Sequence, residues 1–347
     1  MTKITYLLGA GASADALPTN KAETENLTLP YEMRLLANKL EVWYKQRTEN
    51  EREQIHNPTQ VITDLIWLSD NSKRFETTDT YAKFLYAKKE TQGLERLKKT
   101  LSFFFVYQQL IEKKIDKRAL VFLTNLIEKG PTFPSTVNII SWNYDLQIEL
   151  AANEILEESC TSGNKHKALL QYFPPLHYGP EKDEPAKYQL VHMNGTAGHL
   201  YLSDSKKTNP LISLKGANIP KLLQWHYSEN NSNYSILTFA WENDNKDPNE
   251  VMASSIRQDS NNIAEVFIKD TEILVIIGYF FPFFNREIDN KLMAILKSST
   301  PIFKKIYFQD KFINSDFIDK QFNILRSAPI KIEHISRCDN YFIPPEL

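Results

Sequence analysis

Four predicted strands each end in a short cluster of glycine or polar residues whose types suit anion binding or the activation of water. The clusters are Gly9-Ala10-Gly11-Ala12-Ser13, Trp142-Asn143-Tyr144-Asp145, His192-Met193-Asn194-Gly195-Thr196, and Gly278-Tyr279 with the Asn285-Arg286 stretch that follows. In an open α/β sheet, the carboxyl ends of parallel strands border the ligand-binding crevice. We therefore expect the four clusters to converge at one edge of a sheet.

The first cluster, Gly9 to Ser13, follows an apolar run that contains β-branched residues. Small residues at a strand-to-helix junction let backbone amides approach an anion at a helix N-terminus, which favours a phosphate-binding turn. The third glycine of the dinucleotide fingerprint is missing. Ser13 takes its place, as a residue that can begin a helix or donate to a phosphate. A tight turn without a ligand is the alternative.

The second cluster places Asn143 and Asp145 one residue apart, where a strand passes into a helix. Asn and Asp commonly cap helices, so capping is the alternative reading for one of them. It leaves the other free for chemistry. Trp142 is typical of a core residue but can also line a binding site.

The third and fourth clusters carry polar side chains in positions with two interpretations. His192 and Asn194 alternate with apolar residues on a strand, so both point to one face, where they are poor core material. A satisfied structural histidine is the alternative. Asn285 and Arg286 open a helix: they can form its N-cap and first turn, or Arg286 can reach a phosphate.

Hydrophobic periodicity predicts an α/β fold, with a Rossmann-like, doubly wound parallel sheet and an inserted α-helical module. Strands are expected at 2–8, 136–142, 188–193, 272–277, 303–308 and 330–335, and helices at 145–158, 262–269, 285–297 and 315–325. The alternation breaks after Pro18 and returns at Thr136. We therefore assign residues 1–18 and 131–347 to the sheet domain and 19–130 to the module. Residues 159–186 are expected to be a surface excursion, and 199–260 show no clear pattern.

The composition excludes several classes of protein. The chain has 347 residues, 41 basic and 43 acidic, so its net charge of −2 provides no global field for nucleic acid or anionic membranes. No apolar run approaches the roughly 18 residues that span a bilayer. The two cysteines lack C-x-x-C spacing, which excludes a thiolate zinc site. We expect a cytoplasmic protein that binds no metal, membrane or nucleic acid.

Taken together, the segments resemble the SIR2-like family, most of all the bacterial SIR2-like NAD-cleaving proteins associated with defence against phage. The resemblance rests on Gly9 to Ser13, Asp79-Thr80-Tyr81-Ala82-Lys83, Ser141 to Asp145, His192 to Thr196, and Ile276-Ile277-Gly278-Tyr279-Phe280 with Asn285 to Asp289, in that order along nearly the whole chain. It implies a Rossmann-type domain whose substrate is NAD. Deacetylase sirtuins share the fold but have a four-cysteine zinc module, so protein deacylation is the least favoured activity.

The resemblance also implies roles for individual residues. Gly9 to Ser13 would hold the pyrophosphate, Asn143 would position water at the anomeric carbon, and Asp145 would lie near the nicotinamide. The family often shows His-x-His-Gly, with the second histidine as general base, and here Asn194 occupies that position. A carboxamide cannot take up a proton. We therefore predict that His192 supplies the base and that Asn194 binds a ribose hydroxyl.

These observations predict an NAD+ glycohydrolase that forms nicotinamide and ADP-ribose and acts in anti-phage defence by depleting NAD. The alternative is a weakly active or inactive SIR2-like subunit that binds NAD or another nucleotide and regulates a partner. Little sequence follows the last expected strand. Control is therefore expected from homo-oligomerisation or from a separately encoded sensor or activator protein.

Overall fold

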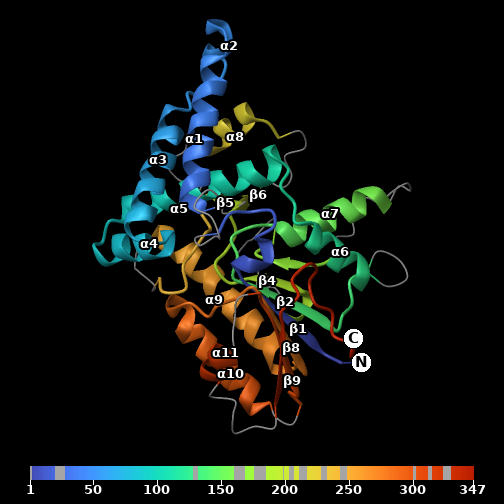
Figure 1. The fold of residues 1–347 in the computed structure, drawn as a ribbon. Helices are drawn as coiled ribbons and strands as arrows, with labels where there is room; N and C mark the ends of the chain where they lie inside the picture. Colours follow the sequence, from blue (N-terminus) through green and yellow to red (C-terminus); the bar gives the residue numbers. More distant parts are fainter. Residues whose placement is uncertain are drawn as a thin grey trace.

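The computed structural model describes residues 2–19, 28–127, 132–159, 169–175, 185–197, 199–202, 207–210, 217–227, 233–242, 248–299, 302–311, 315–322 and 330–347. Within these ranges the chain forms a parallel β-sheet with helices on both faces. A helical module lies at the carboxyl ends of the strands (Figure 1). This confirms the predicted fold class, a Rossmann-like α/β sheet with an inserted helical module.

The described strands form a seven-stranded, all-parallel sheet in the order β10-β9-β8-β1-β2-β4-β3. They are β1 (Ile4–Leu8), β2 (Val137–Ser141), β3 (Tyr172–Phe173), β4 (Leu190–His192), β8 (Ile273–Ile277), β9 (Lys305–Gln309) and β10 (Lys331–Ile335). The chain builds outward from β1 on one side and then continues at β8 on the other. The carboxyl ends of β1 and β8 are thus the topological switch point, where ligands bind in this class of fold.

Both faces of the sheet are covered, which explains why its strands are continuous apolar runs. On β1, Ile4, Tyr6 and Leu8 pack under α6 (Lys117–Leu126) and α7 (Gln147–Ser159). Leu7 belongs to the core of the opposite face. That face is covered by α9 (Pro248–Lys269), α10 (Arg286–Ser298) and α11 (Ser315–Gln321) (Figure 1).

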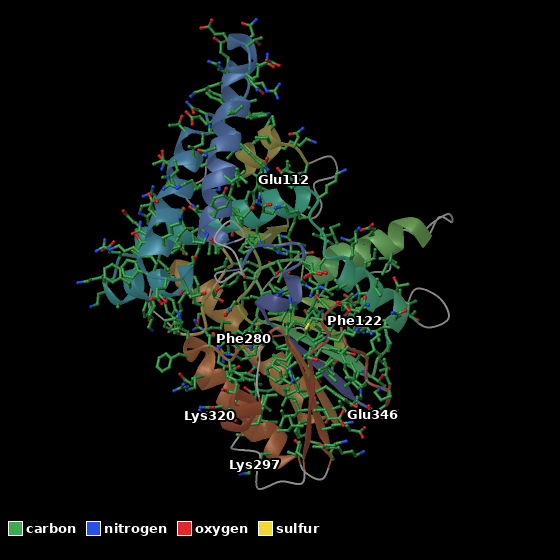
Figure 2. All side chains as sticks on the ribbon, viewed as in Figure 1. Glu112, Phe122, Phe280, Lys297, Lys320 and Glu346 are labelled. Carbon is green, nitrogen blue, oxygen red and sulfur yellow. The ribbon has the colours of Figure 1, made fainter. Side chains whose placement is uncertain are left out.

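Large side chains fill the space between the sheet and the helices that cover it. Figure 2 shows Phe122 between α6 and the sheet, where its ring meets Tyr6 edge-on with centroids 4.8 Å apart. The exposed charged residues Lys297, Lys320 and Glu346 lie on the outside of the same domain. None of the helices in the described ranges has both the length and the apolar character that crossing a membrane requires.

The inserted module stands over the carboxyl ends of the strands (Figure 1). Its described helices are α1 (Leu29–Lys45), α2 (Glu49–Glu53), α3 (Thr59–Arg74), α4 (Thr78–Ala87) and α5 (Thr91–Val106), which continues into a π-helical turn (Tyr107–Ile111). Residues at helical spacing, such as Met33, Leu36 and Leu40, face the module's own core. The helix α6 falls within the range assigned to the module but packs on the sheet, and the boundary at 130–131 lies outside the described residues.

Two regions without a clear sequence pattern contain regular structure. Within the expected excursion, β3 adds a two-residue edge strand to the sheet. Further on, β5 (His199–Leu202), β6 (Lys207–Pro210) and β7 (Asn233–Ser235) form a small antiparallel sheet, with α8 (Ile219–His226) between β6 and β7. Strands this short show too few residues to reveal alternation. The helix α9 begins at Pro248, 14 residues before the predicted start.

Candidate functional site

The glycine cluster forms a tight turn against the end of β8. A single 3-10 turn covers Ala10–Ser13, so Ser13 ends this turn and does not begin a helix as predicted. The Gly9 amide donates to the Ile277 carbonyl and the Gly11 amide to the Gly278 carbonyl, both over 3.0 Å. Three amides of the turn, including that of Ala12, therefore already donate within the protein.

Close backbone contact explains why glycine occupies these positions. A Cβ atom on Gly9 would lie 2.6 Å from the Gly278 carbonyl oxygen. Gly278 itself has a φ of +59°, and a Cβ there would lie 2.4 Å from the Cα of Gly11. The turn thus has a structural role at the switch point. An incoming phosphate would have to use other donors of the turn or displace these contacts, and the phosphate-binding role stays a prediction.

Asn143 ties the end of β2 to this turn. Its Nδ2 donates to the Gly9 carbonyl oxygen over 2.9 Å and to the Ser13 hydroxyl over 3.1 Å. The two hydrogens of the amide nitrogen are thereby used. The carbonyl oxygen Oδ1 is the part of the side chain that remains for a water molecule or a ligand hydroxyl.

Asp145 lies on the other side of the Ser13 hydroxyl. The Gln147 amide donates to its Oδ1 over 3.2 Å at the start of α7, so Asp145 does cap that helix. Burial raises the pKa of Asp145 to about 6, although hydrogen bonds from Ser13 and Gln147 and the nearby His192 lower it. At neutral pH the side chain is mostly a carboxylate, close to the range where it exchanges a proton.

His192 is a buried ion-pair partner in this structure. Its Nε2 lies 2.6 Å from Oε1 of Glu149, and its Nδ1 lies 3.2 Å from the backbone carbonyl oxygen of Asn143. An imidazolium, which carries hydrogen on both ring nitrogens, would donate to both partners. Burial opposes the charge, but the Glu149 carboxylate outweighs it and raises the pKa of His192. An imidazolium in this position has no ring lone pair to accept a proton, and the prediction that His192 supplies the base stays a prediction.

Asn194, which stands in the position of the family's second histidine, is incompletely bonded. Its Nδ2 donates to the Trp142 carbonyl over 3.2 Å, whereas its buried Oδ1 has no partner among the described residues. The same is true of the Trp142 indole Nε1 and the Thr238 hydroxyl. The Thr238 amide donates to the Asn194 carbonyl over 2.8 Å, so these residues are neighbours. We refer to Trp142, Asn194 and Thr238 as the Asn194 corner.

The residues after Asn194 shape the chain and face elsewhere. Gly195 has a φ of +64°, and a Cβ there would lie 2.0 Å from the Ile236 carbonyl oxygen. Thr196 is buried, and its hydroxyl lies 2.5 Å from Nδ1 of His199. The expectation that Gly195 and Thr196 contact a ligand stays a prediction, since both make close contacts within the fold.

The fourth cluster joins the site through Gly278, which contacts the glycine turn, and through Tyr279. The Tyr279 ring stacks on Trp142, with centroids 5.9 Å apart and planes 7° from parallel. Its hydroxyl donates to Asp289 over 2.8 Å and accepts from Asn285 Nδ2 over 3.0 Å. Burial raises the pKa of Asp289 to about 7, while the hydrogen bond from Tyr279 lowers it. Asn285 stands at the N-cap of α10 without capping through its side chain.

Arg286 is separate from this group. It is exposed, and its guanidinium carbon lies 4.8 Å from the centroid of the Phe283 ring, which is 70% exposed. The predicted contact of Arg286 with a ligand phosphate has no support in this placement.

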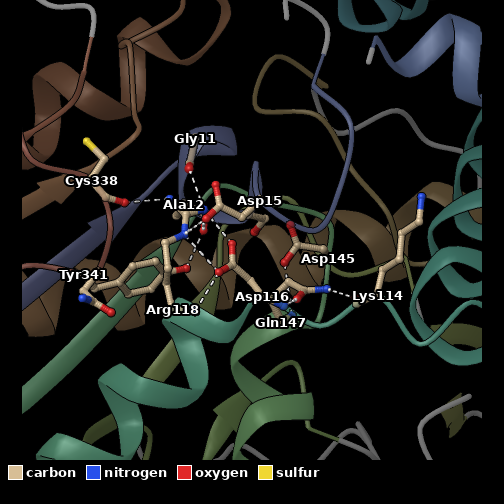
Figure 3. Close-up of polar contacts among 12 residues, drawn as sticks. Gly11, Ala12, Asp15, Lys114, Asp116, Arg118, Asp145, Gln147, Cys338 and Tyr341 are labelled. Carbon is tan, nitrogen blue, oxygen red and sulfur yellow. Dashed lines mark hydrogen bonds and ion pairs between the residues drawn. The ribbon is translucent and has the colours of Figure 1, made fainter. Parts of the chain in front are cut away.

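A buried arginine that the sequence did not single out holds the glycine turn from behind. Figure 3 shows the Arg118 guanidinium between the turn and Asp116; its Nη2 donates to the Ala12 carbonyl over 3.0 Å and to Asp116 over 2.6 Å. Tyr341 adds a hydrogen bond to the Ala12 carbonyl over 2.6 Å. We refer to Ser13, Asp116, Arg118, Asn143 and Asp145 as the turn network.

The helical module reaches the site at several points. Tyr144 donates to Asp79 of α4 over 2.8 Å, and Gln109, on the π-helical turn, accepts from the Leu146 amide over 2.8 Å. Residues 235–242, which we call the covering segment, connect module and sheet. Its Glu242 accepts from Lys98 of α5 over 2.9 Å, and its Thr238 contacts Asn194 as described above.

The predicted catalytic residues are all buried: Asn143 is 9% exposed, Asp145 8%, His192 2% and Asn194 5%. The structure thus brings Asn143, Asp145, His192 and Asn194 together with the glycine turn, Trp142 and Tyr279, and leaves Arg286 apart. A shallow hollow of about 340 Å³ lies elsewhere, on α1 of the module.

Sequence reasoning missed Glu149, Arg118 and Thr238. Glu149 is an acidic residue in the first turn of a helix, a position that acids commonly occupy at the surface. The one available signal was its place four residues after Asp145, on the side of the helix that also carries the buried Ile148 and Ala152. Arg118 and Thr238 have no such signal.

No protein-family model matches the chain, and no curated protein matches it. The SIR2-like resemblance therefore stays a prediction that rests on the motifs. Among the described residues, no three His, Cys, Asp or Glu side chains gather as a metal site would require.

Proposed function

We propose that this chain is a SIR2-like protein that hydrolyses NAD+ to nicotinamide and ADP-ribose. The observation that carries the proposal is the contact of Asn143 with Gly9 and Ser13, which joins residues 134 and 130 positions apart at the carboxyl ends of β1 and β2. Two of the motifs behind the family resemblance are thus in contact, beside the switch point where α/β sheets bind nucleotides.

The residues present suit a reaction that proceeds through an oxocarbenium-like state. The bond between ribose and nicotinamide breaks, a water adds to the anomeric carbon, and that water's proton is released. Asn143 Oδ1 would orient the water, since the amide nitrogen is already engaged. Asp145, with its pKa of about 6, is mostly ionised at neutral pH and would stabilise the developing positive charge and receive the proton.

The Asn194 corner would contact the ribose. A hydroxyl of ribose can both donate and accept, and it would find the unpartnered oxygens of Asn194 and Thr238 and the indole of Trp142 there. Unpaired buried polar atoms are rare in folded proteins, and each costs free energy until a partner arrives. Their presence beside Asn143 supports a polar ligand at this place.

A second candidate function has a specific observation in its favour. His192 has both ring nitrogens engaged, and Asn194 cannot accept a proton. A general base typically contributes about 10² to 10⁴-fold. A subunit that binds NAD or a related nucleotide, reacts slowly and regulates a partner is therefore the alternative. In either case we propose control by self-assembly or by a separate activator. For the NAD hydrolase we also propose a role in anti-phage defence through NAD depletion.

To test the proposal, the pure protein is incubated with NAD and the release of nicotinamide is measured. NAD binding is measured separately by calorimetry. We expect release by the wild type and none by Asn143→Ala. Asn71→Ala, which removes a half-buried amide on α3, is the matched control and should leave release unchanged. Binding without release would favour the regulatory subunit. If the protein neither binds NAD nor releases nicotinamide, both functions are contradicted.

A further inference from the structure

Glu149 and His192 form a buried ion pair at the candidate site. Glu149 lies in the first turn of α7 and His192 ends β4, and both side chains are 2% exposed. Their 2.6 Å contact joins a helix to a strand across 43 residues of sequence. A pair this buried is costly to form, so it needs a compensating role.

The pair acts on Asn143 through the second ring nitrogen. Nδ1 of His192 donates to the Asn143 backbone carbonyl over 3.2 Å, while the Asn143 side chain donates to Gly9 and Ser13. The backbone of Asn143 is thus held from β4, and its side chain is held from the glycine turn. The Ser260 hydroxyl of α9 fixes the other end of the arrangement by donating to the His192 carbonyl over 2.9 Å.

We propose that Glu149 and His192 are a positioning pair: Glu149 keeps His192 as an imidazolium, and His192 holds Asn143 in place and supplies positive charge under Asp145. Neither residue contacts the substrate. Only the expected effect of the pair on the reaction rate rests on the proposed NAD cleavage. The charge state of His192 and the contacts of the pair do not require a ligand.

The charged and titratable groups around the pair are few among the described residues. Asp145, at the start of α7, is influenced by both members: the His192 cation lowers its pKa and the Glu149 anion raises it. The pKa of the Tyr172 phenol, on β3, is raised mainly by burial of the ring. The negative charge of Glu149 is the second cause. A neutral His192 would leave Glu149 as an uncompensated buried anion.

Nitrogen NMR of the full-length protein measures the charge state directly. The chain has seven histidines, and the His192 signals are those absent from His192→Gln. We expect His192 to be an imidazolium at pH 8 in the wild type and neutral at that pH in Glu149→Gln. Glu154→Gln, an exposed glutamate on the same helix, is the matched control and should leave His192 charged. A neutral wild-type His192 at pH 8 would overturn the proposal.

The pH dependence of nicotinamide release distinguishes positioning from catalysis. In His192→Gln the cation that lowers the Asp145 pKa is lost, so the acidic limb of the kcat profile should move to higher pH. The double variant Glu149→Gln/His192→Gln loses both charges, and its limb should return toward that of the wild type. Each single variant should lower kcat by about 10- to 100-fold through misplacement of Asn143, with KM changed little.

Loss of all release in His192→Gln, together with an unchanged rate and pH profile in Glu149→Gln, would show that His192 itself is a base and would overturn the pair. If the wild type releases no nicotinamide, the proposed function fails while the NMR result still decides the charge state. A neutral His192 with normal NAD cleavage would refute the pair alone.

Discussion

The turn network, which includes Asn143, and the Asn194 corner, which includes the adjacent Trp142, differ in how well their polar atoms are bonded. In the turn network, the Arg118 guanidinium, the Asn143 amide nitrogen and the Asp116 carboxylate all have partners at 2.6 to 3.1 Å. In the corner, Asn194, Trp142 and Thr238 each bury a polar atom without one. Saturated contacts make a rigid scaffold, whereas a polar atom without a partner can bind a group that a ligand supplies.

The two carboxyl groups near the site follow the same division. Asp145 belongs to the saturated side, where Ser13, Gln147 and His192 partly offset its burial and hold its pKa at about 6. Asp289, behind Tyr279, has one phenol for a partner, and its pKa rises to about 7. Substitutions on the two sides should therefore have opposite effects on stability.

The largest effect is expected at Arg118. Arg118→Met removes the charge but keeps the aliphatic stem, and it leaves the Asp116 carboxylate buried and unpaired. Breaking a buried pair in this way costs about 3–5 kcal/mol of unfolding free energy. Urea denaturation measures the loss. Arg337→Met, at an ion pair whose arginine side chain is 85% exposed, is the control and should change stability by less than about 0.5 kcal/mol. An equal effect of both variants would refute the scaffold role.

At Asp289 we expect a gain in stability. Because its pKa rises from 3.8 to about 7 on folding, the folded protein holds a proton that the unfolded chain releases, and native stability falls as pH rises between these values. Asp289→Asn keeps the acceptor for Tyr279 and cannot ionise. Its advantage over the wild type should grow by roughly 2–3 kcal/mol between about pH 5 and pH 8. A constant difference across this range would show that Asp289 does not titrate as described.

The sequence predicted the scaffold better than the contacts within it. Apolar runs such as Ile273 to Ile277 identify buried parallel strands, because a strand covered on both faces needs apolar side chains throughout. The order of the clusters then placed Gly9, Asn143 and His192 at one edge. The hydrogen-bond partners of a side chain come from residues far away in the sequence. No local sequence pattern identifies these partners.

Two particular residues illustrate this limit. His192 was predicted to be a free base, yet Glu149, 43 positions earlier, binds its Nε2. Thr238 lies in a region without periodicity, and only folding brings its amide to the Asn194 carbonyl. Residue types at strand ends therefore indicate where chemistry is possible, while the distant partners decide which atoms remain available for it.

Asn194→His tests whether the corner lacks a base. An imidazole there would have a pKa near its ordinary value of about 6.5 and could accept a proton at neutral pH. We expect nicotinamide release to rise by about 10- to 100-fold. Asn194→Ala, which removes the unpartnered oxygen without adding a base, is the comparison and should lower NAD affinity. Release that appears only in Asn194→His would favour the regulatory-subunit function for the natural chain.

The smallest effect on stability, and the sharpest test of the comparison, is expected at Thr238. Thr238 and Thr271 are both fully buried. The Thr271 hydroxyl contacts Thr5 Oγ1 over 2.6 Å and donates to the Phe267 carbonyl over 2.7 Å, whereas the Thr238 hydroxyl has no partner among the described residues.

Thr→Val replaces a hydroxyl by a methyl group of similar size. The two variants therefore differ in the hydrogen bonds that the replaced hydroxyl made. Thr271→Val should lose about 1–3 kcal/mol because the contacts of the buried hydroxyl with Thr5 and the Phe267 carbonyl are lost, and Thr238→Val should be neutral or slightly stabilising. If the corner binds ribose, Thr238→Val should nevertheless raise the KM for NAD several-fold while Thr271→Val leaves it unchanged. Equal losses of stability would mean that the Thr238 hydroxyl is satisfied within the fold, and the corner would then no longer indicate a ligand.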